Sequence, residues 1–178
     1  MAASRLLGVF REHGYDGASL AELSKATGLG RSSLYHHFPG GKEDMAKAVF
    51  DHIHEWMEIS ALAPLREPGD PAERLQKMIN AIDRYYVGGY ERCLLGSFVL
   101  GGSRGRFQPQ LKSSFSGLIK ALAALAVEAG ASQEQGFERA EEAVVQIQGS
   151  LVVSGGLDDP APFRRVMERL PRLILGRS

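Results

Sequence analysis

The sequence has little of several features that mark particular classes of protein. Its 178 residues include a single cysteine, Cys93, so no internal disulfide can form and we expect a reducing compartment. No apolar run reaches the roughly 18 residues of a membrane-spanning helix. The first residues, MAASRLLGVFREHG, lack the apolar region of a signal peptide. We therefore expect a cytoplasmic protein with no membrane partner.

The sequence also has no excess of either positive or negative charge. Lys plus Arg number 21 and Asp plus Glu number 21, so the formal charge is zero and a nucleic-acid partner must be argued from a local motif. Residues 1–42 contain five basic and three acidic side chains, which gives them 5 − 3 = +2 and leaves −2 for the remainder. With 44% apolar and 24% charged residues, the chain is ordinary globular material.

Strand patterns are scarce, because apolar residues recur at spacings of three and four rather than two. We predict an all-α fold in two parts, a three-helix DNA-binding domain over 1–46 and a helical bundle over 47–178 that binds a ligand and dimerises. Pro and Gly mark the helix ends, and a Pro- and Gly-rich boundary falls at 64–71. The first helix is expected to end at His13-Gly14, and the others cover about 20–27, 31–38, 42–61, 71–87, 90–101, 107–130, 132–154 and 160–175.

The segment from 19 to 38 has the pattern of a helix-turn-helix. Ser19 and Glu22 have the spacing of a capping box, which predicts the start of a short helix. Gly28 supplies the turn, and Leu34 and Phe38 form the inner face of the second helix. The outer face of that helix carries side chains that can reach phosphates and base edges: Arg31, Ser32, Ser33, Tyr35, His36 and His37.

The run FREHGYDGASLAELSKATGLGRSSLYHHFPGGK, residues 10–42, resembles the DNA-binding domain of the tetracycline-repressor (TetR) family. Leu34, Tyr35, His37 and Phe38 match its most specific core. Residues 91–103, ERCLLGSFVLGGS, are similar to a core helix in the branch related to multidrug-efflux repressors.

The resemblance implies a DNA-binding transcriptional regulator, a repressor that a small molecule releases from a near-palindromic operator. It also implies base contacts from the residues that open the recognition helix and phosphate contacts from Ser19, Tyr35, His37 and Lys42. The chain departs from the family pattern in two places. Two glycines separate Pro39 from Lys42 where one residue is usual, and Thr27 replaces a small alanine.

Two broad apolar stripes near the C-terminus predict a homodimer, which would double the DNA surface that is read. Family members pair through the corresponding two helices. The expected interface residues are Val144, Ile147, Leu151, Phe163, Val166, Met167 and Leu170.

Aromatic side chains in the middle helices predict an apolar effector site, although core packing explains most of them equally well. The expected lining residues are Trp56, Tyr86, Cys93, Phe98 and Phe115.

Other functions have less support from the residues. The five histidines lie between 13 and 54 without metal-ligand spacing, and no cofactor motif or catalytic set is present, so we expect no metal, no cofactor and no enzyme. Cys93 is either a small core side chain or a redox-active thiol. The alternatives that stay open are a helical sensor or interaction module without operator binding and an enzyme built on the bundle.

Overall fold

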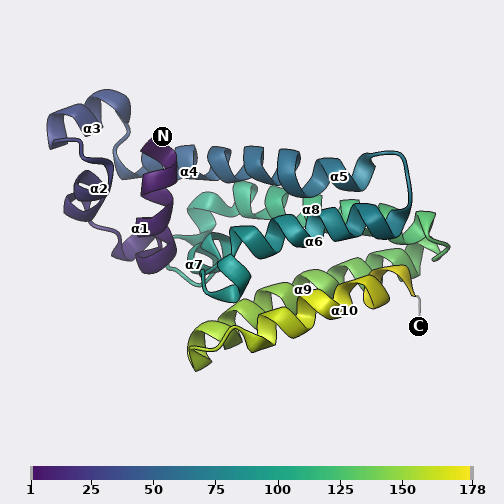
Figure 1. Cartoon of the computed structure of the whole chain (residues 1–178). Helices are drawn as coiled ribbons and strands as arrows, with labels where there is room; N and C mark the ends of the chain where they lie inside the picture. Colours follow the sequence, from purple (N-terminus) through teal and green to yellow (C-terminus); the bar gives the residue numbers. More distant parts are fainter. Residues whose placement is uncertain (1, 177–178) are drawn as a thin grey trace. The chain divides into compact units, whose positions relative to one another are not determined.

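The computed structural model describes residues 2–176 as helices joined by turns, with no strand among them (Figure 1). The all-α prediction is therefore confirmed. The chain forms two compact units. The first contains residues up to Glu55 together with Cys93–Leu111, and the second contains Trp56–Arg92 together with the residues from Lys112 onward. The first unit is thus built from two separate segments of the sequence. The predicted division at residues 46 and 47 concerns function and stays a prediction.

The first unit has its predicted helices in the predicted order. They are α1 Ala2–Gly17, α2 Leu20–Thr27, α3 Arg31–His37 and most of α4 Lys42–Trp56, followed after the excursion into the second unit by α7 Leu94–Val99 and the short 3-10 helix η3 Arg104–Phe107. α1 bends where the sequence predicts its end, because Gly14 takes a left-handed φ of 64° there.

Five aromatic rings form the core of the first unit. Phe98 of α7 lies at the centre, with its ring centroid 5.8 Å from that of Phe10, 4.9 Å from that of Phe50 and 5.1 Å from that of Phe107. Tyr15 packs edge-on against Phe107 at 4.9 Å. Since these rings belong to α1, α4, α7 and η3, one cluster joins the two segments of the unit.

The second unit contains the rest of the helices. They are the π-helix η1 Met57–Leu62, α5 Ala63–Arg66, α6 Pro71–Tyr85, the 3-10 turn η2 Val87–Gly89, most of α8 Gln108–Glu128, α9 Gln133–Leu157 and α10 Ala161–Leu175. α9 and α10 pack against each other as an antiparallel pair (Figure 1). Arg74 is buried in this unit, where it pairs with Glu128 at 2.5 Å and donates to the carbonyl of Glu67 at 2.6 Å.

Three helices differ from the prediction in an informative way. The helix expected over 42–61 becomes a π-helix after Trp56. The helix expected over 90–101 covers only Leu94–Val99, because the backbone at Cys93 is extended and a left-handed turn through Gly88 and Gly89 precedes it. The helix expected to end at 154 passes through Gly155-Gly156 and ends at Asp158, whose φ is 52°. Glycine permits a stop without enforcing one.

Two kinds of feature are absent from residues 2–176. None of the helices within 2–176 is long and apolar enough to cross a membrane. Within the same residues, no group of three or more His, Cys, Asp or Glu side chains is arranged to hold a metal ion.

The aromatic core generates a stability prediction. Phe98 is 2% exposed, so Phe98→Ala should lower the free energy of unfolding by about 3–5 kcal/mol through lost burial and a cavity. Phe137, which is 49% exposed, is the matched control, and Phe137→Ala should cost far less. Denaturant unfolding followed by circular dichroism measures both. Equal losses for the two variants would contradict a core centred on Phe98.

Candidate nucleic-acid interface

The turn between α2 and α3 is closed by hydrogen bonds from small polar side chains. Gly28 takes the predicted left-handed conformation, with φ of 72°. Ser24 Oγ donates to the carbonyl of Leu29 at 2.6 Å, and the Thr27 hydroxyl donates to the carbonyl of Leu23 at 2.8 Å. Thr27 also accepts from the N–H of Leu29 at 3.4 Å, which explains a hydroxyl where the family usually has alanine. These hydrogen bonds hold the turn that sets the angle between α2 and α3.

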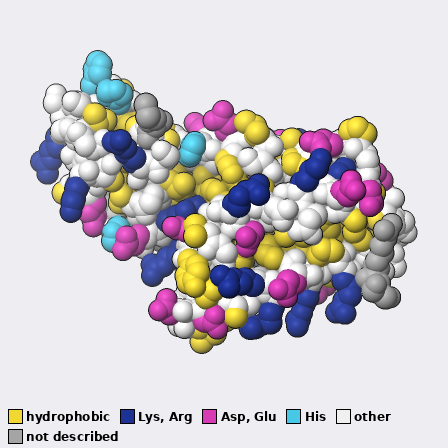
Figure 2. Space-filling view, viewed as in Figure 1, with side chains coloured by type: hydrophobic (Ala, Val, Ile, Leu, Met, Phe, Trp, Pro, Cys, Tyr) yellow, Lys and Arg dark blue, Asp and Glu magenta, His cyan; other side chains and the backbone are white. Residues whose placement is uncertain are grey.

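α3 presents one buried and one open face. Leu34 is buried against the unit, whereas the six predicted DNA-contacting residues of this helix are all exposed. Figure 2 shows Lys, Arg and His side chains gathered over α2 and α3. The exposed side chains are Arg31, Ser32, Ser33, Tyr35, His36 and His37.

One of the two histidines is oriented by the helix itself. The Nδ1 atom of His37 lies 2.8 Å from the carbonyl oxygen of Ser33, one turn earlier. Because a carbonyl can only accept, Nδ1 carries the proton, and Nε2 remains as the outward group. The rings of His36 and His37 meet edge to face at 5.7 Å.

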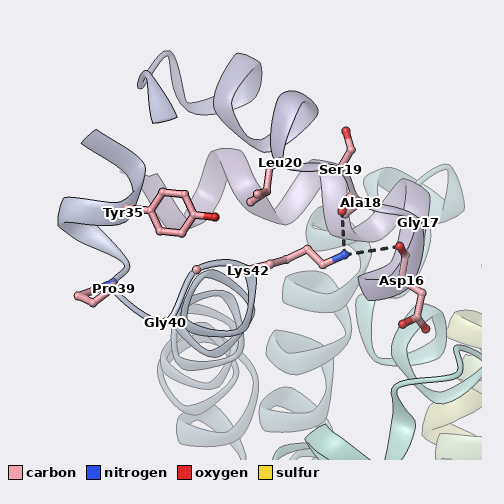
Figure 3. Close-up of a pocket in the computed structure, with 10 residues that line it drawn as sticks. Asp16, Gly17, Ala18, Ser19, Leu20, Tyr35, Pro39, Gly40 and Lys42 are labelled. Atoms are coloured by element: carbon pink, nitrogen blue, oxygen red, sulfur yellow. Dashed lines mark hydrogen bonds between the residues drawn. The ribbon is translucent and has the colours of Figure 1, made fainter. Parts of the chain in front are cut away.

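A pocket of about 630 Å³ lies beside the recognition helix, between the first turns of α2 and α4 (Figure 3). Its wall includes Ser19 and Leu20 from α2, Tyr35 from α3 and Lys42 from α4. The Tyr35 hydroxyl points into this space. Gly41 has φ of 66°, and a Cβ there would lie 3.4 Å from the Tyr35 ring, so the loop before α4 packs closely against Tyr35.

Ser19 forms the predicted capping box. Its N–H and its hydroxyl both donate to Glu22 Oε2, at 2.9 and 2.7 Å, and the N–H of Glu22 donates back to Ser19 Oγ at 3.2 Å. The N–H of Ser19, followed by its hydroxyl, lowers the pKa of Glu22. The residue predicted to contact phosphate is therefore also the one that starts α2.

The Lys42 side chain makes its hydrogen bonds within the first unit. Its ammonium donates to the carbonyl of Ala18 at 2.9 Å and to that of Asp16 at 3.5 Å, and it lies 4.7 Å from the centre of the Tyr15 ring. In this structure the side chain joins α4 to the turn before α2 (Figure 3). A direct phosphate contact would require the ammonium to leave these acceptors, and a role for Lys42 in DNA binding stays a prediction.

The acidic side chains near the pocket have partners within the same unit. The Asp16 carboxylate accepts from the hydroxyl and the N–H of Ser103, and the hydroxyl bond is the main reason that the pKa of Asp16 is lowered. Glu43 pairs with Lys47 at 2.7 Å and with Arg106 at 2.5 Å, and these hydrogen bonds lower its pKa. Arg106 also lies 5.8 Å from the centre of the Tyr15 ring.

The comparisons with known proteins agree with this geometry. Residues 4–49 match the family model described as "Bacterial regulatory proteins, tetR family". Residues 4–49 of this chain therefore belong to the TetR family of bacterial regulatory proteins.

Two TetR-family structures share the fold over nearly the whole chain. A TetR transcriptional regulator from Legionella pneumophila superposes with a TM-score of 0.80 at 21% identity, covering 96% of this chain and 94% of that one. A cysteine mutant of CifR, solved with operator DNA, gives 0.74 at 20% identity over 96% and 94% of the two chains.

Among curated relatives, LmrA of Bacillus subtilis is 35% identical over 81 residues, which are 46% of this chain and 42% of LmrA. The match thus spans less than half the length of that relative. LmrA is named as a transcriptional regulator, and placement in the multidrug-efflux branch stays a prediction.

The five residues predicted to bind an effector fall into two groups, one in each unit. Cys93 and Phe98 lie in the first unit, both buried, and Phe98 is the centre of its aromatic core. Trp56, Tyr86 and Phe115 lie in the second unit. Trp56 stacks on Tyr85 with ring centroids 3.9 Å apart. Tyr86 meets Phe163 edge-on at 5.9 Å. A role in effector binding stays a prediction for all five.

The predicted dimer residues are mostly buried within the single chain, and their place in a dimer interface stays a prediction. Six of them are already buried in the chain's own fold: Val144, Ile147, Leu151, Phe163, Met167 and Leu170, while Val166 is half-buried. The broad apolar face of α9 packs against other helices of its own unit, as the apolar face of a bundle helix does. The apolar residues that remain exposed on α9 include Val145 and Val152, with Gly149 and Gly156 along the same stripe.

Several residues that support the interface were not found from the sequence. Arg5 donates to the carbonyl of Thr27 at 2.9 Å and so satisfies the end of α2. Ser103 and Arg106 reach α1 and α4 from a segment more than 60 residues away. Nothing local in the glycine- and arginine-rich run 101–106 signals these partners.

The capping box generates a pH prediction. Since the pKa of Glu22 is lowered from 4.5 in the folded protein, its stabilising effect is present above pH 4.5 and is lost as pH falls toward the folded value. Wild type should melt at a higher temperature than Glu22→Gln at neutral pH, and the difference should shrink below pH 4.5. Thermal melts across a pH series measure this. A difference that stays constant down to pH 3 would contradict the assignment.

Proposed function

We propose that the chain is a homodimeric transcriptional repressor that binds a near-palindromic operator and leaves it when a small molecule binds the second unit. The observation that carries this proposal is the exposed polar face of α3, held on a capped and hydrogen-bonded helix-turn-helix. In this family such a helix enters the major groove, where base pairs differ in their donors and acceptors. The CifR structure with operator DNA supports the same use of the fold.

Each exposed residue takes a role from its place on the helix. Arg31, Ser32 and Ser33 open α3 and would meet base edges first. Tyr35, whose hydroxyl points into the pocket of Figure 3, would donate to a backbone phosphate. His36 and His37 lie at the other end of the helix, where they would contact the backbone or neighbouring bases. Ser19 would contact phosphate from the start of α2.

An effector site in the second unit would draw on its aromatic residues. Trp56, Tyr85 and Tyr86 form a continuous series of rings there, since Tyr85 and Tyr86 meet at 5.0 Å. α4 is the connection to the first unit, because its last turn contains the boundary between Glu55 and Trp56. A ligand would release DNA only to the extent that it binds the DNA-free conformation better than the DNA-bound one.

A dimer would bring two recognition helices to one operator. The exposed stripe on α9, with small glycines beside Val145 and Val152, would allow a second copy's helix to approach closely. These valines are 64% and 63% exposed in the single chain, so burying them would remove apolar surface from water. Val166 of α10 would lie at the edge of the same interface.

The proposal is tested by a mobility shift of the purified protein on the DNA that flanks its own coding region, across a salt series. Saturable binding to a short near-palindrome, by two chains or a multiple, with affinity falling as salt rises, is the expected result. Binding that is indifferent to sequence and salt would favour a sensor or interaction module instead.

Removing one contact of each kind should separate positioning from base reading. Tyr35→Phe should weaken binding to all DNA sequences, because a phosphate contact carries no sequence information. Arg31→Ala should cost about 1–3 kcal/mol on the operator and relax base preference at one position if its contact is bidentate. Affinities on the operator and on single-base variants measure both. Wild-type affinities for both variants would show these contact assignments to be wrong.

The dimer face makes its own prediction. Val152→Lys should give monomers, because a buried lysine on each chain would be desolvated without a partner. Ile59→Lys is the control, since Ile59 is also an exposed apolar side chain of the second unit but lies on η1. Light scattering after size exclusion gives both masses. A dimeric Val152→Lys protein would exclude this stripe as the interface.

A further inference from the structure

The pocket beside α3 has few donors that are ready for a phosphate. A DNA phosphate is held by N–H and O–H groups. At the α2 end, the N–H and hydroxyl of Ser19 are both donated to Glu22. At the α4 end, the N–H of Gly40 is donated to Asp44 Oδ2 at 2.6 Å. Glu22 and Asp44, which do not themselves line the pocket, thus each accept from a residue of its wall, Ser19 and Gly40.

The two carboxylates are not equivalent. Glu22 closes a reciprocal capping box, so the start of α2 depends on it. Asp44 makes its hydrogen bond to the loop before α4, and no Lys or Arg nitrogen of the described residues lies within 4 Å of its carboxylate oxygens. Its neighbour Glu43, by contrast, pairs with both Lys47 and Arg106. Asp44 thus forms no ion pair within 4 Å in the first turn of α4, although its charge, after that of Glu43, also helps to raise the pKa of Lys47.

The Asp44 carboxylate lies directly against Gly40, which is part of the pocket wall. A Cβ built on Gly40 would be 2.5 Å from Asp44 Oδ1 and 2.7 Å from Oδ2. The carboxylate therefore fills the space beside this glycine, and it lies at the helix end where a phosphate would otherwise be favoured.

We propose that Asp44 competes with a DNA phosphate for this end of the pocket and so lowers the affinity of the protein for DNA. The inference rests on the proposed DNA-binding function and deepens it. A lower DNA affinity would make the protein easier for a ligand to release from DNA. An effector can release DNA only by its differential affinity, so a weaker DNA complex is released by a smaller difference.

The test replaces Asp44 with Asn, which retains an acceptor for Gly40 and removes the charge. At low ionic strength, Asp44→Asn should bind both the operator and an unrelated duplex at least about threefold more tightly, the factor for one unit charge about 6 Å from a phosphate in water. The gain should shrink as salt rises. Fluorescence anisotropy with labelled duplexes measures the affinities.

Asp51→Asn is the matched control. Asp51 is exposed on the same face of α4, two turns and about 10 Å further along, and its loss changes the net charge equally. Asp44→Ser is a second neutral variant, and circular dichroism confirms that each variant is folded. If neither Asp44 variant binds DNA more tightly than Asp51→Asn, the competition is overturned while DNA binding stands. A wild-type protein that binds no DNA would overturn both.

Discussion

The edge-to-face packing of Tyr15 on Phe107 fixes the surroundings of the candidate phosphate pocket. Phe107 ends the short helix η3, so its burial places Arg106 beside Glu43 and Ser103 beside Asp16. The outer surface of Tyr15 then lies within cation–π range of Lys42 and Arg106. One ring contact in the core thereby determines which charges surround the first turn of α4, and that turn forms one end of the pocket.

Around the helix-turn-helix, stability and DNA contact use overlapping groups. Ser19 caps the start of α2 and also lines the pocket. Lys42 is a cation in the pocket wall, but its ammonium already donates to backbone carbonyls. Such sharing means that affinity for a phosphate is the difference between a new contact and a broken internal one. If the proposed contacts form, each would therefore give moderate rather than maximal DNA affinity, and specificity would come from base contacts by α3 and from pairing of two chains.

Local signals explain what the sequence predicted well. The capping box of Ser19 and Glu22, the left-handed Gly28 and the buried Leu34 each depend on residues within a few positions, so spacing alone identified them. The position of Lys42 and the partners of Asp16 depend on side chains brought together by folding. The dimer interface stays a prediction for a different reason. An apolar helix face predicts burial, but it does not say whether the covering surface belongs to the same chain. Val145 and Val152 became distinguishable from Val144 and Leu151 only once the packing of α9 was known.

The membership of residues 93–111 in the first unit has a consequence for how such proteins diversify. The DNA-reading helices are contiguous in sequence, but their core is not, because Phe98 and Phe107 come from the second segment. A genetic exchange that transferred only the first 55 residues into a relative would pack Phe10 and Phe50 against that relative's side chains in place of Phe98. New operator preferences are therefore more readily acquired by substitutions on the exposed face of α3 than by shuffling of whole domains.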